Sequence, residues 1–258
     1  GDNMMGAIGT GNLRAGVVTA SLGTSGTLYA FSESPVVDAQ GEVAAFCDST
    51  DQWLPLVCTM NVTVATEHVR NLFGWDHATF DEAVRSVPAG SEGLLFLPYL
   101  NGERTPNLPN GTGVYHGLNP RTLRPAHLAR AAMEGATLGL AYGLERFRQL
   151  GLHPGEIRLT GGGSNSGVWR QIAADVFGVP TVCLATAEGA ALGAALQAAA
   201  TASAAAGHNE PLERIAVRAV RADDSTRCEP QPAAASLYRD HLDRMTALTR
   251  KLHAAGCL

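Results

Sequence analysis

Short apolar runs separated by glycine-rich turns predict β-strands near the start of the chain. Residues 17–22 form an apolar run of strand length, residues 23–26 form a tight turn, and residues 27–32 return as a second strand. This pattern predicts a β-hairpin. Further short strands are predicted at 44–46, 53–57, 93–100 and 114–118.

Helical spacing of apolar residues dominates the rest of the chain. Residues 2–15 predict a helix of small residues, and residues 61–73 and 80–87 predict two more. Pro125 lies early in a long predicted helix, which Gly151 ends. Beyond it, strands at 156–159 and 181–184 alternate with helices at 166–177 and 188–200. Strands first, then alternating helices and strands, indicate an α/β domain with a mixed sheet flanked by helices.

The last part of the chain divides into two predicted segments. Residues 201–232 have no periodic pattern and are rich in alanine, proline and charge, which predicts a partly flexible connection. Residues 233–258 contain an amphipathic helix, which we expect to pack on the same domain as residues 1–200.

Composition and charge exclude several classes of protein. The net charge is −5 and the basic residues are scattered, so nucleic acid is not an expected partner. No apolar stretch is long enough to span a membrane, and no signal peptide is visible. Five cysteines without zinc-site or redox-pair spacing indicate reduced thiols, so a cytoplasmic protein is expected. The abrupt start at Gly1 suggests a fragment whose upstream half is absent.

Two glycine- and hydroxyl-rich turns carry the candidate chemistry. They span residues 21–27 and 159–166, and each follows an apolar run. Glycine lets backbone N–H groups approach a phosphate closely, and serine or threonine adds a hydroxyl donor. Together the two turns indicate a phosphate-handling enzyme that clamps one nucleotide.

Other interpretations of the turns fit less well. A serine hydrolase needs glycine two residues after Ser25, where this chain has Thr27. A dinucleotide site needs a third glycine where this chain has Ser166, and it leaves the hairpin turn unexplained. A mononucleotide explains both turns, because a helix that begins near Ser166 offers N–H groups to phosphate. The alternative that the glycines only permit close packing stays open.

Individual polar residues are ambiguous from spacing alone. Asp2 could act as a general base, although a helix N-cap is the favoured interpretation. Glu103 and Arg104 could contact a polar substrate or pair with each other. The histidines have no metal-ligand spacing, so no metal ligand is predicted in this chain.

One long motif resembles the C-terminal domain of the FGGY carbohydrate kinases. The segment 113–118, Gly-Val-Tyr-His-Gly-Leu, is followed after eight residues by 127–134, His-Leu-Ala-Arg-Ala-Ala-Met-Glu. This arrangement matches the family's C-terminal signature at every defined position. Gly1-Asp2-Asn3 and the two turns fall in the right order around it.

The resemblance implies an actin-like, ribonuclease-H-like ATPase fold and a kinase that uses ATP and Mg²⁺ and releases ADP. In this family two domains close over a cleft, with the sugar mainly on the first domain and the nucleotide mainly on the second. A missing first domain would supply the Mg²⁺-binding acid and most sugar contacts, so this chain alone is expected to be inactive, and a homodimer is expected. The implied site residues are Asp2 as catalytic base, Asp2 and Asn3 at the sugar, Gly23, Thr24 and Ser25 at the β- and γ-phosphates, and Gly162, Gly163 and Ser166 at the adenosine and α-phosphate.

The expected substrate also comes from the resemblance. Residues 101–106, Asn-Gly-Glu-Arg-Thr-Pro, are similar to the family branches that phosphorylate xylulose and gluconate. Conversion of D-xylulose to D-xylulose 5-phosphate is the favoured activity. A kinase for another sugar or sugar acid, such as gluconate, and a non-catalytic nucleotide-binding regulator are the alternatives.

Overall fold

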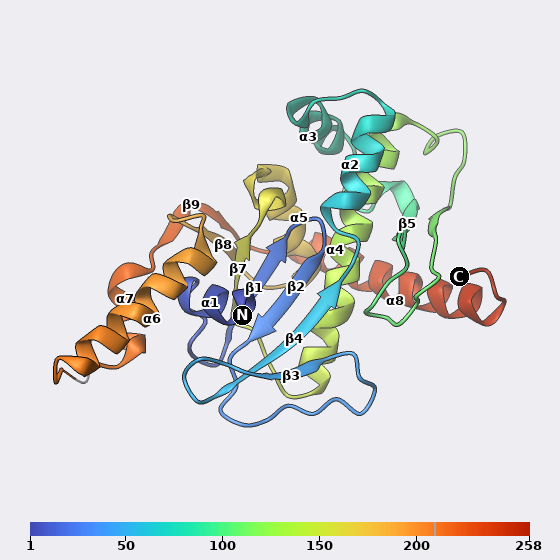
Figure 1. The fold of residues 1–258 in the computed structure, drawn as a ribbon. Helices are drawn as coiled ribbons and strands as arrows, with labels where there is room; N and C mark the ends of the chain where they lie inside the picture. The colour runs from blue at the N-terminus through green and yellow to red at the C-terminus, as the bar shows by residue number, and fades with distance from the viewer. Residues whose placement is uncertain (209) are drawn as a thin grey trace.

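A mixed seven-stranded sheet forms the centre of the computed structural model, which describes residues 1–208 and 210–258 (Figure 1). The strand order is β3-β4-β2-β1-β7-β8-β9. Strand β1 pairs antiparallel with β2 and parallel with β7, so the two predicted turns follow neighbouring strands. The strands are β1 (Val17–Leu22), β2 (Gly26–Ala30), β3 (Ala44–Cys47), β4 (Trp53–Thr59), β7 (Glu156–Thr160), β8 (Thr181–Leu184) and β9 (Ala222–Cys228).

Helices cover both faces of this sheet. On one face α4 (Pro125–Gln149) and α5 (Gly167–Phe177) pack against the strands, and α8 (Pro232–Ala254) packs against both helices. On the other face α1 (Asp2–Gly9) packs against α6 (Gly189–Ala205), and α7 (Leu212–Ala219) contacts α6. Figure 1 shows α6 and α7 at one end of the molecule and α8 at the other.

A smaller unit of structure stands above the carboxyl ends of the central strands. Helices α2 (Thr63–Leu72) and α3 (His77–Ser86) both contact α4, and a two-stranded sheet of β5 (Leu95–Pro98) and β6 (Gly113–His116) lies beside the same helix. This places α2 and α3 opposite the start of α5, across the end of the sheet (Figure 1).

Alternation along the strands sorts the side chains between the two faces. In β1, the apolar side chains of Val18, Ala20 and Leu22 join the main core, which also contains residues of α4. The intervening Thr19 and Ser21 face α1 and the second layer. Successive side chains of a strand point to opposite faces of the sheet, so alternating apolar and polar residues give the strand one hydrophobic face.

The predicted hairpin, mixed sheet and long central helix are confirmed. The first helix is shorter than predicted and ends at Gly9 instead of residue 15. Gly11 has a φ of 65°, and the Asn12 side chain turns into the sheet, where its Nδ2 donates to the Tyr29 carbonyl at 2.8 Å. The chain therefore leaves the helix to enter β1.

The connection predicted over residues 201–232 contains regular structure instead. Helix α6 continues to Ala205, α7 follows, and β9 pairs antiparallel with β8 at the edge of the sheet. The sequence of β9 is mostly polar and its side chains are mostly exposed, so no hydrophobic alternation marks it as a strand. Residue 209, which falls within the predicted connection, lies outside the described residues.

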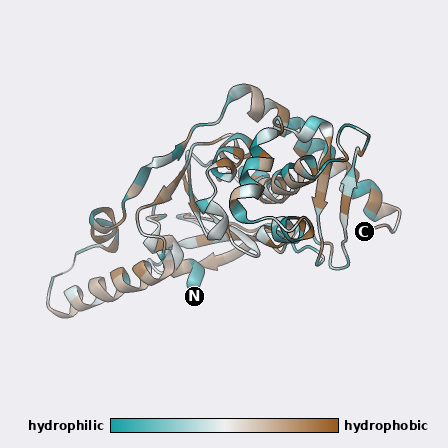
Figure 2. Ribbon diagram, turned by 90° about the horizontal axis from the view of Figure 1, so that it is seen from above, coloured by the Kyte–Doolittle hydropathy of each residue, from teal (hydrophilic) through white to brown (hydrophobic). Residues whose placement is uncertain are grey.

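The alanine-rich helix α6 projects from the body of the molecule and is nearly uniformly pale in Figure 2. This even colouring reflects weakly apolar alanine all round the helix. In the described part of the chain, no helix combines the length and apolarity needed to cross a bilayer.

Candidate functional site

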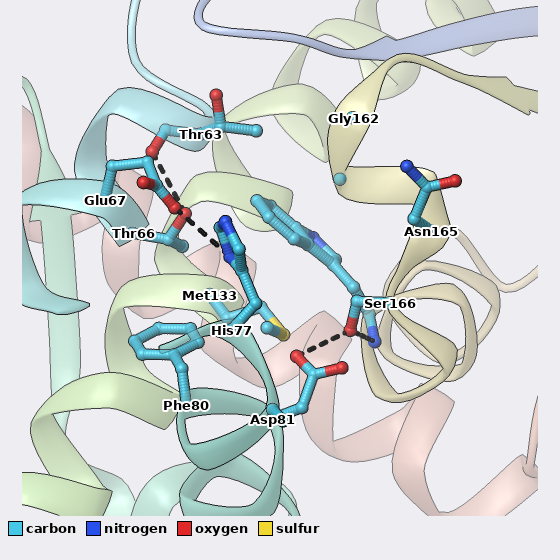
Figure 3. Close-up of a pocket in the computed structure, with 13 residues that line it drawn as sticks. Thr63, Thr66, Glu67, His77, Phe80, Asp81, Met133, Gly162, Asn165 and Ser166 are labelled. Atoms are coloured by element: carbon cyan, nitrogen blue, oxygen red, sulfur yellow. Dashed lines mark hydrogen bonds and ion pairs between the residues drawn. The ribbon is translucent and has the colours of Figure 1, made fainter. Parts of the chain in front are cut away.

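The larger of two cavities at the carboxyl ends of β1 and β7 has a volume of about 510 Å³. Helices α2 and α3 form one side, the glycine-rich turn after β7 and the start of α5 form the other, and apolar side chains form its base (Figure 3). Ligands in α/β sheets bind beyond the carboxyl ends of the strands. The apolar lining residues are Ala78, Phe80, Met133 and Trp169, and the polar ones include Thr63, Thr66, Glu67, His77, Asp81, Asn165 and Ser166.

The smaller cavity, about 240 Å³ in volume, lies on the α1 side of the same strand ends. Asp2 and Asn3 line it from the start of α1, and Glu188 lines it from the start of α6. Its base is a row of three hydroxyls, since Ser21 pairs with both Thr27 and Thr160 in adjacent strands.

The turn after β7 separates the two cavities and lines both of them. Gly161 lines the smaller cavity, whereas Gly162 and Gly163 line the larger one. Gly161 has a φ of 83°, and a Cβ atom there would lie 2.7 Å from the Leu22 carbonyl carbon and 3.0 Å from the Gly23 nitrogen. Only glycine permits this approach, so the two predicted turns pack directly against each other.

The turn between β1 and β2 presents backbone donors at this junction. The carbonyls of Gly23 and Thr24 accept hydrogen bonds from the N–H groups of Thr63 and Val62, at 2.9 and 3.1 Å, which fixes the turn to the start of α2. Outside strand pairing, no hydrogen bond among the described residues has the N–H of Gly23, Thr24 or Ser25 as its donor. The exposed side chains of Thr24 and Ser25 line neither cavity. The donors that this turn could offer to an anion are therefore its backbone N–H groups and not these side chains.

Ser166 has two structural contacts at the wall of the larger cavity. Its Oγ accepts the Trp169 N–H at 3.2 Å, which caps α5, and donates to Asp81 Oδ1 at 2.9 Å (Figure 3). The serine thereby joins the start of α5 to α3.

Asp2 does not cap α1. The N-cap residue is Gly1, and the helix has no side-chain cap. Asp2 is exposed, and its Oδ1 accepts only the neighbouring Asn3 N–H, at 2.9 Å, among the described residues. The interpretation favoured from spacing is therefore wrong, and the carboxylate faces the smaller cavity instead.

Among the described residues, Glu103 does not pair with the Arg104 guanidinium, which donates to Cys58 Sγ instead. Its buried carboxylate accepts the N–H groups of Met60 and Arg104 at 2.7 and 2.8 Å and the Asn61 Nδ2 at 3.1 Å. Burial raises the pKa of Glu103, even though these donors oppose the shift. The residue anchors the loop to the segment that leads into α2.

Sequence reasoning missed the cavity residues of α2 and α3. Thr63, Thr66 and Glu67 have helical spacing, but such polar spacing is also typical of a solvent-facing side. Hydrogen bonds from Arg70 hold the pKa of Glu67 below its usual range, and His77 Nδ1 lies 3.7 Å from Glu67 Oε1. The missed residues therefore give one wall of the cavity an ionised carboxylate.

Preformed metal centres in proteins are built mainly from acidic, histidine and cysteine side chains. Among the described residues, no group of three or more histidine, cysteine, aspartate or glutamate side chains could hold a metal ion. The smaller cavity nevertheless offers carboxylate and hydroxyl oxygens, which are the ligands that Mg²⁺ accepts together with substrate phosphates.

Comparisons with known proteins agree with this architecture. Residues 18–202 match the model of the C-terminal domain of the FGGY family of carbohydrate kinases. A xylulose kinase from Haemophilus influenzae is 43% identical over 95% of this chain, and the chain spans 48% of that protein, about half of its length.

Solved structures show the same similarity in three dimensions. The structure described as a xyloylose kinase from Brucella ovis has a TM-score of 0.90 and 28% identity, covering 99% of this chain and 51% of that one. A gluconate kinase from Lactobacillus acidophilus has a TM-score of 0.87 and 26% identity, covering 96% and 50%. The fold is thus the actin-like, ribonuclease-H-like fold expected above. This chain belongs to the FGGY family of carbohydrate kinases and contains its C-terminal domain.

Proposed function

We propose that this chain is the nucleotide-binding half of an ATP-dependent sugar kinase that converts D-xylulose to D-xylulose 5-phosphate. The observation that carries the proposal is the pair of cavities joined by the two turns, with Asp2 in the smaller one. The similarity to a xylulose kinase over most of the chain supports this substrate.

The chemistry of the cavities orients the nucleotide. The apolar base of the larger cavity suits the adenosine, whereas the smaller cavity is lined mainly by polar groups, including hydroxyls that can donate to phosphate. The phosphate chain would therefore cross the turns at Gly161 and Gly23, whose backbones pack against each other. Its γ-phosphate would enter the smaller cavity, beside Asp2 and the three hydroxyls.

Within the smaller cavity, Asp2 would remove the proton from the sugar hydroxyl that attacks the γ-phosphate. Its exposed carboxylate is available for this role, since among the described residues it accepts a hydrogen bond only from the backbone N–H of Asn3. Asn3 would contact the same sugar. Phosphoryl transfer depends mostly on positioning and on charge neutralisation, so rigid turns and fixed donors suit it.

Mg²⁺, when bound with the nucleotide, neutralises charge on the phosphates. The carboxylates of Asp2 and Glu188 and the hydroxyls lining the smaller cavity are the oxygens of this chain that would be near such an ion. A few protein oxygens are sufficient, because Mg²⁺ at phosphate sites keeps water and phosphate ligands.

Most sugar contacts in this proposal come from a second domain across the cleft. The chain spans about half the length of the Haemophilus influenzae relative, and we expect turnover only in the longer protein. A sugar acid is the second candidate substrate, since the gluconate kinase structure superposes almost as well.

The test is turnover by the longer protein and its Asp2→Asn variant. With D-xylulose we expect ADP release, and we expect the variant to lose about 10²- to 10⁴-fold in kcat while its ADP affinity is unchanged. Asp240→Asn removes an exposed carboxylate of α8 that lines neither cavity, so it is the control and should keep full activity. Turnover of gluconate without turnover of D-xylulose would replace the substrate. Full activity in Asp2→Asn would contradict the catalytic assignment, and nucleotide binding without turnover by the unmodified longer protein would favour a regulator.

A further inference from the structure

Asp81 is a carboxylate at the wall of the larger cavity whose second oxygen has no hydrogen-bond donor among the described residues. Its Oδ1 accepts the Ser166 hydroxyl at 2.9 Å (Figure 3). Glu67, on α2 at the same side of the cavity, differs because both of its oxygens accept hydrogen bonds from Arg70, at 2.7 to 3.2 Å. Asp81 therefore has acceptor capacity for a ligand, whereas Glu67 is already paired.

Helix α3 holds Asp81 in a fixed position. Asp76 caps the helix by accepting the Thr79 N–H at 2.8 Å, and Phe80 and Val84 anchor it in the core. Arg130 Nη1 also donates to the Val84 carbonyl at 3.1 Å. Because the helix is fixed in the free protein, little conformational entropy of its backbone would be lost when Asp81 binds a ligand.

A hydrogen bond from the Ser166 hydroxyl fixes the orientation of the Asp81 carboxylate. A hydroxyl has one proton to donate, and Ser166 gives it to Asp81 while accepting the Trp169 N–H. Ser166 is thus a positioning residue, and it places Asp81 next to the end of the glycine-rich turn.

Of the three parts of a nucleotide, the ribose is the part best suited to contact Asp81. A phosphate would be repelled by the carboxylate, and the base matches the apolar side chains of Phe80, Met133 and Trp169. The ribose lies between them and carries hydroxyl donors, which carboxylates bind in other nucleotide sites. Asp81 adjoins the turn that is proposed to bind phosphate. It would therefore lie beside the ribose, which is the next group after the phosphates.

We propose that Asp81 accepts a hydrogen bond from a ribose hydroxyl and so makes the site selective for ribonucleotides over deoxyribonucleotides. The proposal rests on the proposed function, because it requires a nucleotide in the larger cavity. It adds a specificity-determining residue that the sequence motifs do not contain.

The test is calorimetric titration of this chain with ADP, 2′-deoxy-ADP and 3′-deoxy-ADP in the presence of Mg²⁺. A lost hydrogen bond to a charged acceptor corresponds to about 10- to 100-fold in affinity, so we expect one deoxy analogue to bind that much more weakly than ADP. Asp81→Ala should bind ADP as weakly as that analogue and should no longer distinguish the two. Glu82→Ala, at the exposed neighbouring position of α3, is the matched control and should retain the preference.

The outcomes separate the two proposals. Equal affinity of the unmodified chain for ADP and both analogues would overturn the role of Asp81 while leaving a nucleotide site in place. A preserved preference in Asp81→Ala would do the same. No binding of any of the three nucleotides would overturn the proposed function, and the Asp81 role with it. The comparison among nucleotides in the unmodified chain holds even if a variant fails to fold.

Discussion

At the residue scale, the adjacent glycines Gly161 and Gly162 are expected to have different roles, Gly161 in stability and Gly162 in nucleotide binding. Gly161 has a left-handed backbone, and a Cβ there would meet the backbone of β1, whereas a Cβ at Gly162 meets nothing within 4 Å. We expect Gly161→Ala to lower the free energy of unfolding by about 1–3 kcal/mol, as strained φ values do. Urea denaturation measures this loss.

Gly162→Ala is expected to leave stability within about 0.5 kcal/mol of the original. Its methyl group would nevertheless stand where the phosphates approach, so we expect ADP binding to weaken roughly tenfold, a typical cost of crowding a close contact. Calorimetric titration measures the affinity. Unchanged ADP binding by a folded Gly162→Ala variant would count against phosphates at this turn.

The loop anchor at Glu103 gives a second residue-scale prediction. Glu103→Gln leaves one acceptor oxygen for the donors from Met60, Asn61 and Arg104. We expect a loss of about 1–3 kcal/mol in the free energy of unfolding, because a buried donor is left unpaired. The exposed Glu82→Gln is the control, and equal stability of the two variants would refute the anchoring role.

At the element scale, the close packing of α1 on α6 positions Asp2. A Cβ at Gly193 would lie 1.8 Å from the Met5 carbonyl oxygen, so only glycine permits this contact. We expect Gly193→Ala to push the helices apart, to destabilise the chain by about 1–3 kcal/mol, and to lower kcat in the longer protein because Asp2 moves. Ala194→Ser, at the next and exposed position, should change neither quantity. Normal turnover in Gly193→Ala would show that α1 is not held by this contact.

A buried polar group ties α8 to α4. The Tyr238 hydroxyl donates to Glu134 Oε1 at 2.7 Å and accepts from Arg130 Nη2 at 3.1 Å. Tyr238→Phe should cost about 1–3 kcal/mol in thermal or urea unfolding, since both charged partners lose a contact. Tyr115→Phe, which removes a single bond to the Leu128 carbonyl, should cost less, and the reverse order would contradict this ranking.

The elements that could be predicted from sequence are those with strong local signals. The β1–β2 hairpin has apolar runs around a glycine turn, and α4 has proline at its start and apolar spacing throughout. Strand β9 has no such signal, because an exposed edge strand is stabilised by pairing with β8 and not by burial. The cavity walls from α2 and α3 could not be predicted either, since their polar faces read as solvent-exposed.

At the scale of the whole molecule, the site is assembled from segments that are distant in sequence. The two turns follow strands β1 and β7, and each turn could be predicted from the sequence. The contact between Gly161 and the end of β1 could not, because it depends on these strands being neighbours in the sheet. Asp2 reaches the same edge through α1, and Asp81 reaches it through α3. The roles of Asp2, Gly23, Gly162 and their neighbours, and the homodimer, stay predictions.

The central claim is that one nucleotide lies across both cavities, with its γ-phosphate beside Asp2. A crystal structure of this chain with a non-hydrolysable ATP analogue and Mg²⁺ tests it most directly. We predict the adenosine between α3 and the start of α5, the phosphates over Gly161 and Gly162, and the γ-phosphate in the smaller cavity. A nucleotide bound with its phosphates at Glu67 and Asp81, or outside both cavities, would contradict the account.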